Sequence, residues 1–223
     1  MGNTVGSFEI NTYWQNKWKV IKSTLKINPQ QRSLIIGSIL GDGTLRIGSK
    51  AINANLKIEH GLPQKEYVFW KYNILRPFIF TEPKVSYRYR ENGKRYAKSW
   101  WFRTVRHPLI TEFYKRFYRN GRKIIPDDIE KDLDVLALAV WIMDDGSLSQ
   151  KRIDISTYSF IEKEIQLLQR VLKKNFGLIA NYYRDRDKGY RMYFKSIETK
   201  KLILLIKPYV VNCLKYKINL KTP

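Results

Sequence analysis

Two apolar stretches of the chain, Leu34–Gly43 and Leu136–Gly146, share one pattern and lie about half the chain apart. In each, about ten apolar or small residues, enough for roughly three helical turns, lead to an acid that is followed at once by glycine. An ordinary surface helix has a single apolar stripe, whereas these stretches are apolar all round. The pattern therefore predicts two buried helices that pack against each other, with the rest of the chain arranged around them.

The acids that end these stretches, Asp42 and Asp145, are predicted to lie at helix carboxyl ends, because a following glycine usually takes the left-handed conformation and stops a helix. A carboxylate is unfavourable there, since the last turn carries about half a negative charge. Mg²⁺ (or Mn²⁺) would resolve the conflict, with the carbonyls of Gly41 and Asp144 as additional oxygen ligands. The alternative is that Asp-Gly merely ends a core helix in a turn. The repetition of the pattern favours the metal site.

The hydrophobic period changes after each stretch, and the same order of elements follows twice. Alternation with a period of two predicts antiparallel hairpins with one apolar face, and helical spacing predicts the helices between them. The predicted elements of the first half are strands 44–47 and 53–59, a helix 64–76, a hairpin 84–90 with 95–106 turned at Asn92-Gly93, and a helix 108–119. Those of the second half are a strand pair within 147–159, a helix 161–175, a hairpin 178–186 with 190–195 turned at Lys188-Gly189, and a helix 198–206.

Both apolar stretches resemble the LAGLIDADG motif of homing endonucleases and related intron maturases, and the resemblance spans about residues 31–217. The letters depart from the eponymous string, which here ends in Ile39-Leu40-Gly41-Asp42 and in Ile142-Met143-Asp144-Asp145. The resemblance implies an α+β fold: a tandem pseudo-twofold repeat of αββαββα with two antiparallel saddle-shaped sheets and the motif helices packed at the interface. We expect a basic extension, 1–30, and then repeats 31–126 and 127–223.

The resemblance also assigns roles to four residues. The final acid of each motif, Asp42 or Asp145, would bind the catalytic metals, and paired metals suit phosphodiester hydrolysis. A lysine near the end of each repeat, Lys123 or Lys217, would stabilise the transition state or orient water. In a chain with many lysines, the alternative for these two is an ordinary surface charge.

The chain is strongly basic, with 42 Lys and Arg against 20 Asp and Glu and a net charge of +22. Such an excess predicts nucleic acid as the partner, because counterion release rewards phosphate contacts. An acidic membrane surface would favour a polybasic block, whereas these cations are spread along the chain. Strands with basic and polar faces suit a major groove, where Arg reads guanine and Asn reads adenine. The predicted DNA-binding residues are Arg46, Asn55, Lys57, Arg88, Arg90, Arg95, Arg103, Arg152, Arg184, Arg186, Arg191 and Lys195.

Cys213 is the only cysteine, which excludes an intrachain disulfide and a cysteine metal site and favours a reducing interior, in an organelle (mitochondrion or chloroplast) or the cytoplasm. No apolar run is long enough to span a bilayer, and no signal-peptide core is present. Residues 1–30 are expected to pack on the main domain, with an organelle-targeting segment or a DNA-contacting arm as alternatives. His60 and His107 are expected to be structural or solvent-exposed.

The predicted function is that of a monomeric, site-specific endonuclease that makes a metal-dependent double-strand break in a long pseudo-palindromic DNA target. By resemblance it would leave short 3′ overhangs and promote homing of its own intron. The rival hypothesis is an intron maturase that binds its intron RNA and assists splicing, with or without DNA cleavage. A catalytically silent DNA-binding regulator should lack a motif acid, and both acids are present.

Overall fold

The computed structural model describes residue 20 and residues 22–220. Its first half contains α2 (Pro29–Leu40), β1 (Thr44–Arg46), β2 (Asn55–Gly61), α3 (Lys65–Leu75), β3 (Lys84–Tyr89), β4 (Arg95–Arg103), α4 (Pro108–Phe117), β5 (Tyr118–Arg119) and β6 (Arg122–Lys123). Its second half contains α5 (Val135–Asp145), β7 (Gly146–Ser149), β8 (Arg152–Ser156), α6 (Glu162–Phe176), β9 (Asn181–Arg184), β10 (Tyr190–Phe194), α7 (Ser196–Ile206) and the 3₁₀ helix η6 (Asn212–Lys217). The predicted order of elements is confirmed in both halves.

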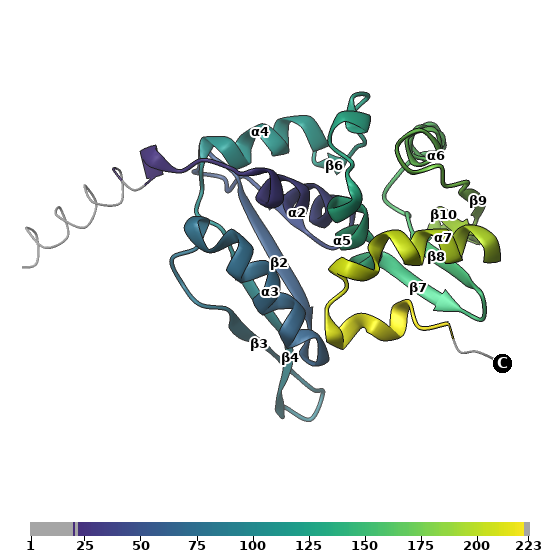
Figure 1. The fold of residues 1–223 in the computed structure, drawn as a ribbon. Helices are drawn as coiled ribbons and strands as arrows, with labels where there is room; N and C mark the ends of the chain where they lie inside the picture. The colour runs from purple at the N-terminus through teal and green to yellow at the C-terminus, as the bar shows by residue number, and fades with distance from the viewer. Residues whose placement is uncertain (1–19, 21, 221–223) are drawn as a thin grey trace, which may run out of the picture.

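Each half builds one antiparallel four-stranded sheet, and the two sheets have matching strand orders, β1-β2-β4-β3 and β7-β8-β10-β9. Figure 1 shows the sheets on either side of the paired helices α2 and α5, with α3 over the first sheet and α7 over the second. Buried residues of both halves form one continuous core around the helix pair. The fold class predicted from the sequence, a tandem α+β repeat around the motif helices, is confirmed.

Side-chain caps start the two motif helices. The side chain of Asn28 accepts a 2.8 Å hydrogen bond from the Gln31 amide, and Gln31 Oε1 accepts one from the Asn28 amide, so α2 begins with a capping box. Asp134 caps α5 through the Ala137 amide, and its second oxygen accepts a 2.5 Å hydrogen bond from the Ser33 hydroxyl of α2. The two helices are therefore joined at their amino ends as well as packed along their length.

The glycines that follow the motif acids do not take the left-handed conformation that the sequence analysis predicted. Gly146 has φ −73°, and neither Gly43 nor Gly146 is among the glycines with positive φ. Both positions lack room for a side chain: a Cβ on Gly43 would lie 2.6 Å from the Ser38 carbonyl oxygen, and one on Gly146 would lie 2.5 Å from that of Ile142. Glycine is thus required because of the close approach of the last helical turn.

Three details of the chain path differ from the predictions. The hairpin at Asn92-Gly93 has a longer turn than two residues, because the Arg90 amide bonds the Lys94 carbonyl and Gly93 lies at φ 75°. The strands β5 and β6 and the helix η6 are additional elements that were not predicted. The helix α2 begins at Pro29, within residues 1–30 that were predicted as an extension, since proline suits the first helical position.

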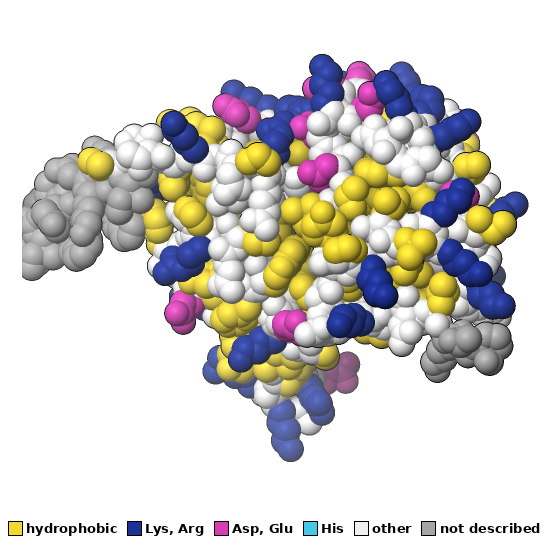
Figure 2. Space-filling model, viewed as in Figure 1, with side chains coloured by type: hydrophobic (Ala, Val, Ile, Leu, Met, Phe, Trp, Pro, Cys, Tyr) yellow, Lys and Arg dark blue, Asp and Glu magenta, His cyan; other side chains and the backbone are white. Residues whose placement is uncertain are grey.

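Leu25 and Ile27 pack against the core, which agrees with the packing expected for residues 1–30. Residues 1–19 and 21 of that segment lie outside the described part of the chain. Within the described part of the chain, no helix is both long enough and apolar enough to cross a membrane. Figure 2 shows that Lys and Arg side chains gather at the tip of the β3–β4 hairpin and around α4 and α6, while apolar side chains cover the middle of the same view.

Candidate active site

The two motif helices approach each other unusually closely. A Cβ on Gly37 of α2 would lie 2.4 Å from the Ala137 carbonyl oxygen of α5, and one on Gly41 would lie 2.4 Å from the Cβ of Asp144. Contacts this short leave no room for a methyl group, so glycine at these positions lets the helix backbones meet. The carboxyl ends of α2 and α5, which carry Asp42 and Asp145, are consequently brought together.

The two motif acids differ in their environments. The side chain of Asp42 is 48% exposed, whereas Asp145 is partly buried. Burial opposes ionisation of Asp42, but a hydrogen bond and charge interaction with His60 and the charges of Lys71 and Lys217 outweigh it, and the pKa of Asp42 is lowered. Burial and the charges of Asp42 and Asp144 raise the pKa of Asp145 to about 8. The charge of each motif acid therefore depends on neighbours in both halves.

The two predicted lysines lie on the ends of the motif helices. Lys123 Nζ donates a 2.7 Å hydrogen bond to the Gly41 carbonyl of α2. Lys217 Nζ donates to the carbonyls of Met143 and Asp144 of α5, at 2.6 and 2.9 Å. Burial lowers the pKa of both lysines, against the attraction of the nearby aspartates. In each half a cation thus neutralises part of the negative helix end that carries the motif acid.

The Asp144 side chain crosses the helix interface into the first half, where it meets three buried side chains. Its carboxylate accepts hydrogen bonds from Lys71 Nζ at 2.7 and 3.0 Å and from the Tyr67 hydroxyl at 2.7 Å. His60 Nε2 lies 3.3 Å from Lys71 Nζ, and His60 Nδ1 lies 3.5 Å from the Asp42 carboxylate. We call Asp144, Lys71, Tyr67 and His60 the crossing network.

The crossing network also reaches the backbone of the first motif acid. Asp144 Oδ2 accepts a 3.1 Å hydrogen bond from the Asp42 amide. Burial lowers the pKa of Lys71, although Asp144 opposes this shift by favouring the charged ammonium. Burial and the negative charge of Asp144 raise the pKa of Tyr67 far above its usual range, so Tyr67 stays a proton donor. A buried carboxylate with an ammonium and a phenol in contact has its charge compensated.

The contacts of His60 were not predicted from the sequence. It is buried, not solvent-exposed, and it joins Asp42 to Lys71. The inward face of β2 was the available signal, because the buried residues Leu56, Ile58 and His60 alternate with half-buried polar positions. His107 is also buried, where it accepts a hydrogen bond from the Leu109 amide at the start of α4, in agreement with the expected structural role.

A divalent cation is compatible with the donors at the two helix ends. The carboxylates of Asp42 and Asp145 and the carbonyls of Gly41 and Asp144 are hard oxygen ligands of the kind that Mg²⁺ prefers. Both carbonyls accept hydrogen bonds from lysines in this structure. Ligand atoms of Asp42, His60 and Asp144 also lie within 4.8 Å of one another. In that second group the Asp144 carboxylate already binds the Lys71 ammonium, which makes it a poor metal ligand.

A pocket beside Asp42 opens onto the exposed face of the first sheet. It has a volume of about 370 Å³, and its lining includes Asp42, Arg46, Lys57 and His60. Strand register extends this surface, because directly opposed residues share a face: Arg46 pairs with Asn55, and Lys57 pairs with Arg103. Four of the predicted DNA-binding residues therefore lie together next to the first motif acid.

The second sheet has a similar basic face, but an aspartate partly neutralises the charges of its arginines. Arg152 and Arg191 lie on it together with Tyr193 and Tyr183, and both arginines contact the buried Asp154, at 2.9 and 3.8 Å. Arg184 pairs with Tyr190 and lies on the opposite face of the sheet from Arg152 and Arg191, although its own side chain is exposed. Successive side chains of β9 point to opposite faces of the sheet, so Tyr183 shares the face of Arg191 and Arg184 does not.

The remaining predicted DNA-binding residues lie at the edges of the sheets. Arg88 and Arg95 belong to the β3–β4 hairpin, whose register shifts at Ser86 and Tyr87, and the Arg95 guanidinium stacks 3.8 Å from the Tyr87 ring centroid. Arg90 is at the turn of the same hairpin, Arg186 is exposed in the turn before β10, and Lys195 is exposed between β10 and α7. These side chains surround the sheet faces.

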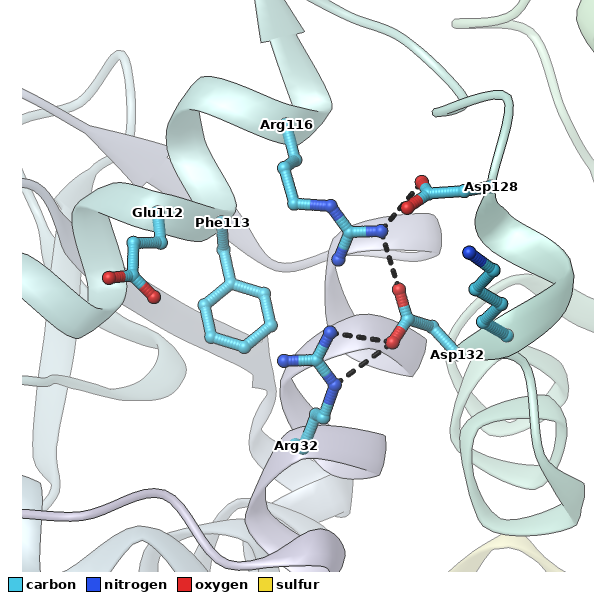
Figure 3. A pocket seen from close by; sticks show the side chains of 7 residues that line it. Arg32, Glu112, Phe113, Arg116, Asp128 and Asp132 are labelled. Atoms are coloured by element: carbon cyan, nitrogen blue, oxygen red, sulfur yellow. Dashed lines mark hydrogen bonds and ion pairs between the residues drawn. The ribbon is translucent and has the colours of Figure 1, made fainter.

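A different pocket, between α2, α4 and the segment before α5, is lined by ion-paired side chains and has no part in this site (Figure 3). Asp132 binds Arg32 of α2 and Arg116 of α4, each at 2.6 Å, and Arg116 also binds Asp128 at 2.7 Å. These pairs hold the connection between the two halves against α2 and α4.

The geometry described above agrees with comparisons to known proteins. A model of the LAGLIDADG DNA endonuclease family matches residues 32–202. The chain is 29% identical over 211 residues to the DNA endonuclease I-ChuI of Chlamydomonas applanata, covering 87% of this chain and 97% of that protein. It is 30% identical over 206 residues to the cytochrome b mRNA maturase bI2 of Debaryomyces hansenii, covering 90% of this chain and 78% of the relative.

The fold is also similar to a solved structure, that of the homing endonuclease I-WcaI bound to its DNA recognition sequence. The TM-score is 0.83 at 22% sequence identity, and the alignment covers 92% of each chain. At this level of identity the similarity concerns the arrangement of the elements.

Proposed function

Because the chain belongs to the LAGLIDADG DNA endonuclease family, we propose that it is a site-specific homing endonuclease that cuts both strands of a long DNA target. The observation that carries the proposal is the pair of motif acids, Asp42 and Asp145, at the adjoining ends of two packed helices beside a basic sheet face. The relative I-ChuI is named as a DNA endonuclease. The positive charge of +22 suits a polyanionic substrate of this kind.

In this proposal, each half of the chain contacts one half-site of the DNA. The sheet faces would lie along two half-sites, with Arg46, Lys57 and Arg103 on one and Arg152 and Arg191 on the other. Because the residues on the two faces differ, the target would be an imperfect palindrome, and one chain with repeats 31–126 and 127–223 would suffice. Basic side chains at the sheet edges would hold phosphates.

We further propose that cleavage depends on Mg²⁺ (or Mn²⁺) held by Asp42 and Asp145, with the carbonyls of Gly41 and Asp144 as additional ligands. A bound divalent cation would activate water and offset the charge that builds on phosphorus. Lys123 and Lys217 would stabilise that charge from the protein side, since their ammonium groups lie at the same helix ends. The lowered pKa of each lysine also makes transfer of a proton to or from water easier.

The proposal is tested by selecting cleaved sites from a randomised DNA pool with the full chain and Mg²⁺. The expected result is a set of related targets that are cut on both strands and have two similar halves. Absence of any cut, at protein concentrations that bind the same DNA, would contradict the proposal.

A second candidate is an intron maturase, and it is favoured by the similarity to the cytochrome b mRNA maturase bI2. The same basic surface would then bind a structured intron RNA. If the protein binds one intron RNA far more tightly than any DNA at the same salt concentration and cuts no DNA, the maturase replaces the endonuclease as the primary function.

A further inference from the structure

The interior below the motif acids is built differently in the two halves. In the first half, the crossing network places a histidine, a tyrosine and a lysine, all buried, between Asp144 and Asp42. Burial of polar groups is unfavourable unless each has a hydrogen-bonding partner. The contacts within this network therefore hold its members in fixed positions.

The equivalent positions of the second half follow from strand register. Thr44 and Ser147 each come directly after a motif glycine, and they pair with Lys57 and Asp154, respectively. From these paired residues to the starts of α3 and α6, the two halves have segments of equal length. The positions that correspond to His60, Tyr67 and Lys71 are therefore Thr157, Glu164 and Leu168.

These three counterparts do not form a second network. Thr157 donates a 2.8 Å hydrogen bond to the Tyr190 carbonyl, and Glu164 binds the Arg122 guanidinium at 3.0 Å. Leu168 is a fully buried core residue. The residue equivalent to Asp144 is Gly41, which precedes the other motif acid and has no side chain to cross the interface. The network is consequently one-sided.

Building on the proposed endonuclease function, we propose that the crossing network positions Asp42 without a counterpart for Asp145, so that the two halves cut their DNA strands at unequal rates. The Asp144 carboxylate accepts a hydrogen bond from the Asp42 amide, and His60 Nδ1 lies beside the Asp42 carboxylate. Lys71 Nζ contacts both of these residues, at 2.7 Å from the Asp144 carboxylate and 3.3 Å from His60 Nε2. His60, Lys71 and Asp144 are thus positioning residues for one motif acid.

The proposal is tested with strands that carry different end labels, so that the rate of each cut is measured separately in a single turnover. The variant Lys71→Leu/Asp144→Leu removes the buried ion pair without leaving an uncompensated charge. It is expected to slow one strand roughly 10- to 100-fold more than the other, because a displacement of about 1 Å can cost about 100-fold in rate. Nicked DNA would then accumulate.

Two further variants separate positioning from general damage. His60→Leu keeps the pair of Lys71 and Asp144, removes the contacts of His60 to the Asp42 carboxylate and to Lys71, and is expected to slow the same strand. Thr157→Val changes the counterpart of His60 in the second half and serves as the control. We expect this variant to keep the same ratio of the two strand-cleavage rates as the unchanged protein.

A second readout uses the protein without metal or DNA. In the variant Lys71→Leu/Asp144→Leu the Asp42 amide loses its acceptor, and its hydrogen exchange should become at least several-fold faster, while the exchange rate of the Asp145 amide is unchanged. Equal slowing of both strands, or an unchanged Asp42 amide, would overturn the positioning role. If the unchanged protein cuts no DNA at all, the endonuclease proposal fails, and amide exchange still decides whether the network holds Asp42.

Discussion

Lys123 Nζ lies 2.7 Å from the Gly41 carbonyl oxygen, directly before the first motif acid, and Lys217 repeats this contact at the end of the second motif helix. If these lysines act on the scissile phosphates, Lys123→Met or Lys217→Met should lower the cleavage rate by at least about 100-fold, as expected for loss of one charge-stabilising group. DNA affinity measured in Ca²⁺ should change by only a few-fold. Lys174→Met is the control, because Lys174 is 68% exposed and pairs with Glu130 away from the site.

The environment of Asp145 predicts an unusual pH dependence of stability in the absence of metal. Its pKa is raised to about 8 from an ordinary value of 3.8, so the folded protein keeps a proton that the unfolded chain releases. The contribution of Asp145 to the free energy of unfolding should therefore be largest below about pH 4 and should fall as the pH rises towards 8. Denaturation in EDTA at several pH values, compared with Asp145→Asn, isolates this contribution. A difference between the two proteins that does not vary with pH would contradict the prediction.

The close approach of the motif helices can be tested through stability. Gly37→Ala should lower the free energy of unfolding by about 1–3 kcal/mol or more, because its Cβ would meet the Ala137 carbonyl oxygen at 2.4 Å. Gly61→Ala is the matched control, since the nearest atom to a Cβ there is 3.8 Å away. Equal stability of the two variants, measured by urea denaturation, would show that α2 and α5 are packed less tightly than described.

Strand register predicts which arginines contact DNA. Arg46→Ala removes a cation beside Asp42 and should weaken binding and reduce the dependence of affinity on salt concentration. Arg184→Ala should leave both quantities nearly unchanged, because Arg184 lies on the helix-covered side of its strand. Affinities in Ca²⁺ at several salt concentrations test this contrast, and a larger effect of Arg184→Ala would reverse the assignment of the faces.

The repeated apolar stretches predicted the paired helices, and alternation within the strands predicted the two sheets, because both signals come from burial. The contacts between the halves could not be predicted in the same way. Asp144 directly precedes a motif acid in the sequence, and its pairing with Lys71 depends on the space that Gly41 leaves across the helix interface. That space exists only once the helices are packed.

Local rules also misplaced some residues where tertiary structure decides. Asp42-Gly43 and Asp145-Gly146 predicted left-handed glycines, but steric contact with the preceding turn is the reason for glycine there. The sequence placed Arg184 on the same strand face as Arg191, whereas the pairing of β9 with β10 puts the two arginines on opposite faces. His60 gave no ligand-spacing signal, because its partners lie on α3, on α5 and directly after the end of α2.

The most direct test of the proposed active site is to measure double-strand cleavage by Asp42→Asn and by Asp145→Asn in Mg²⁺, together with DNA binding in Ca²⁺. Each substitution keeps the size of the side chain and removes its charge. Each should abolish double-strand cleavage and leave DNA affinity within a few-fold of that of the unchanged protein. Undiminished double-strand cleavage by either variant would contradict the central claim that the two motif acids act together at the helix ends.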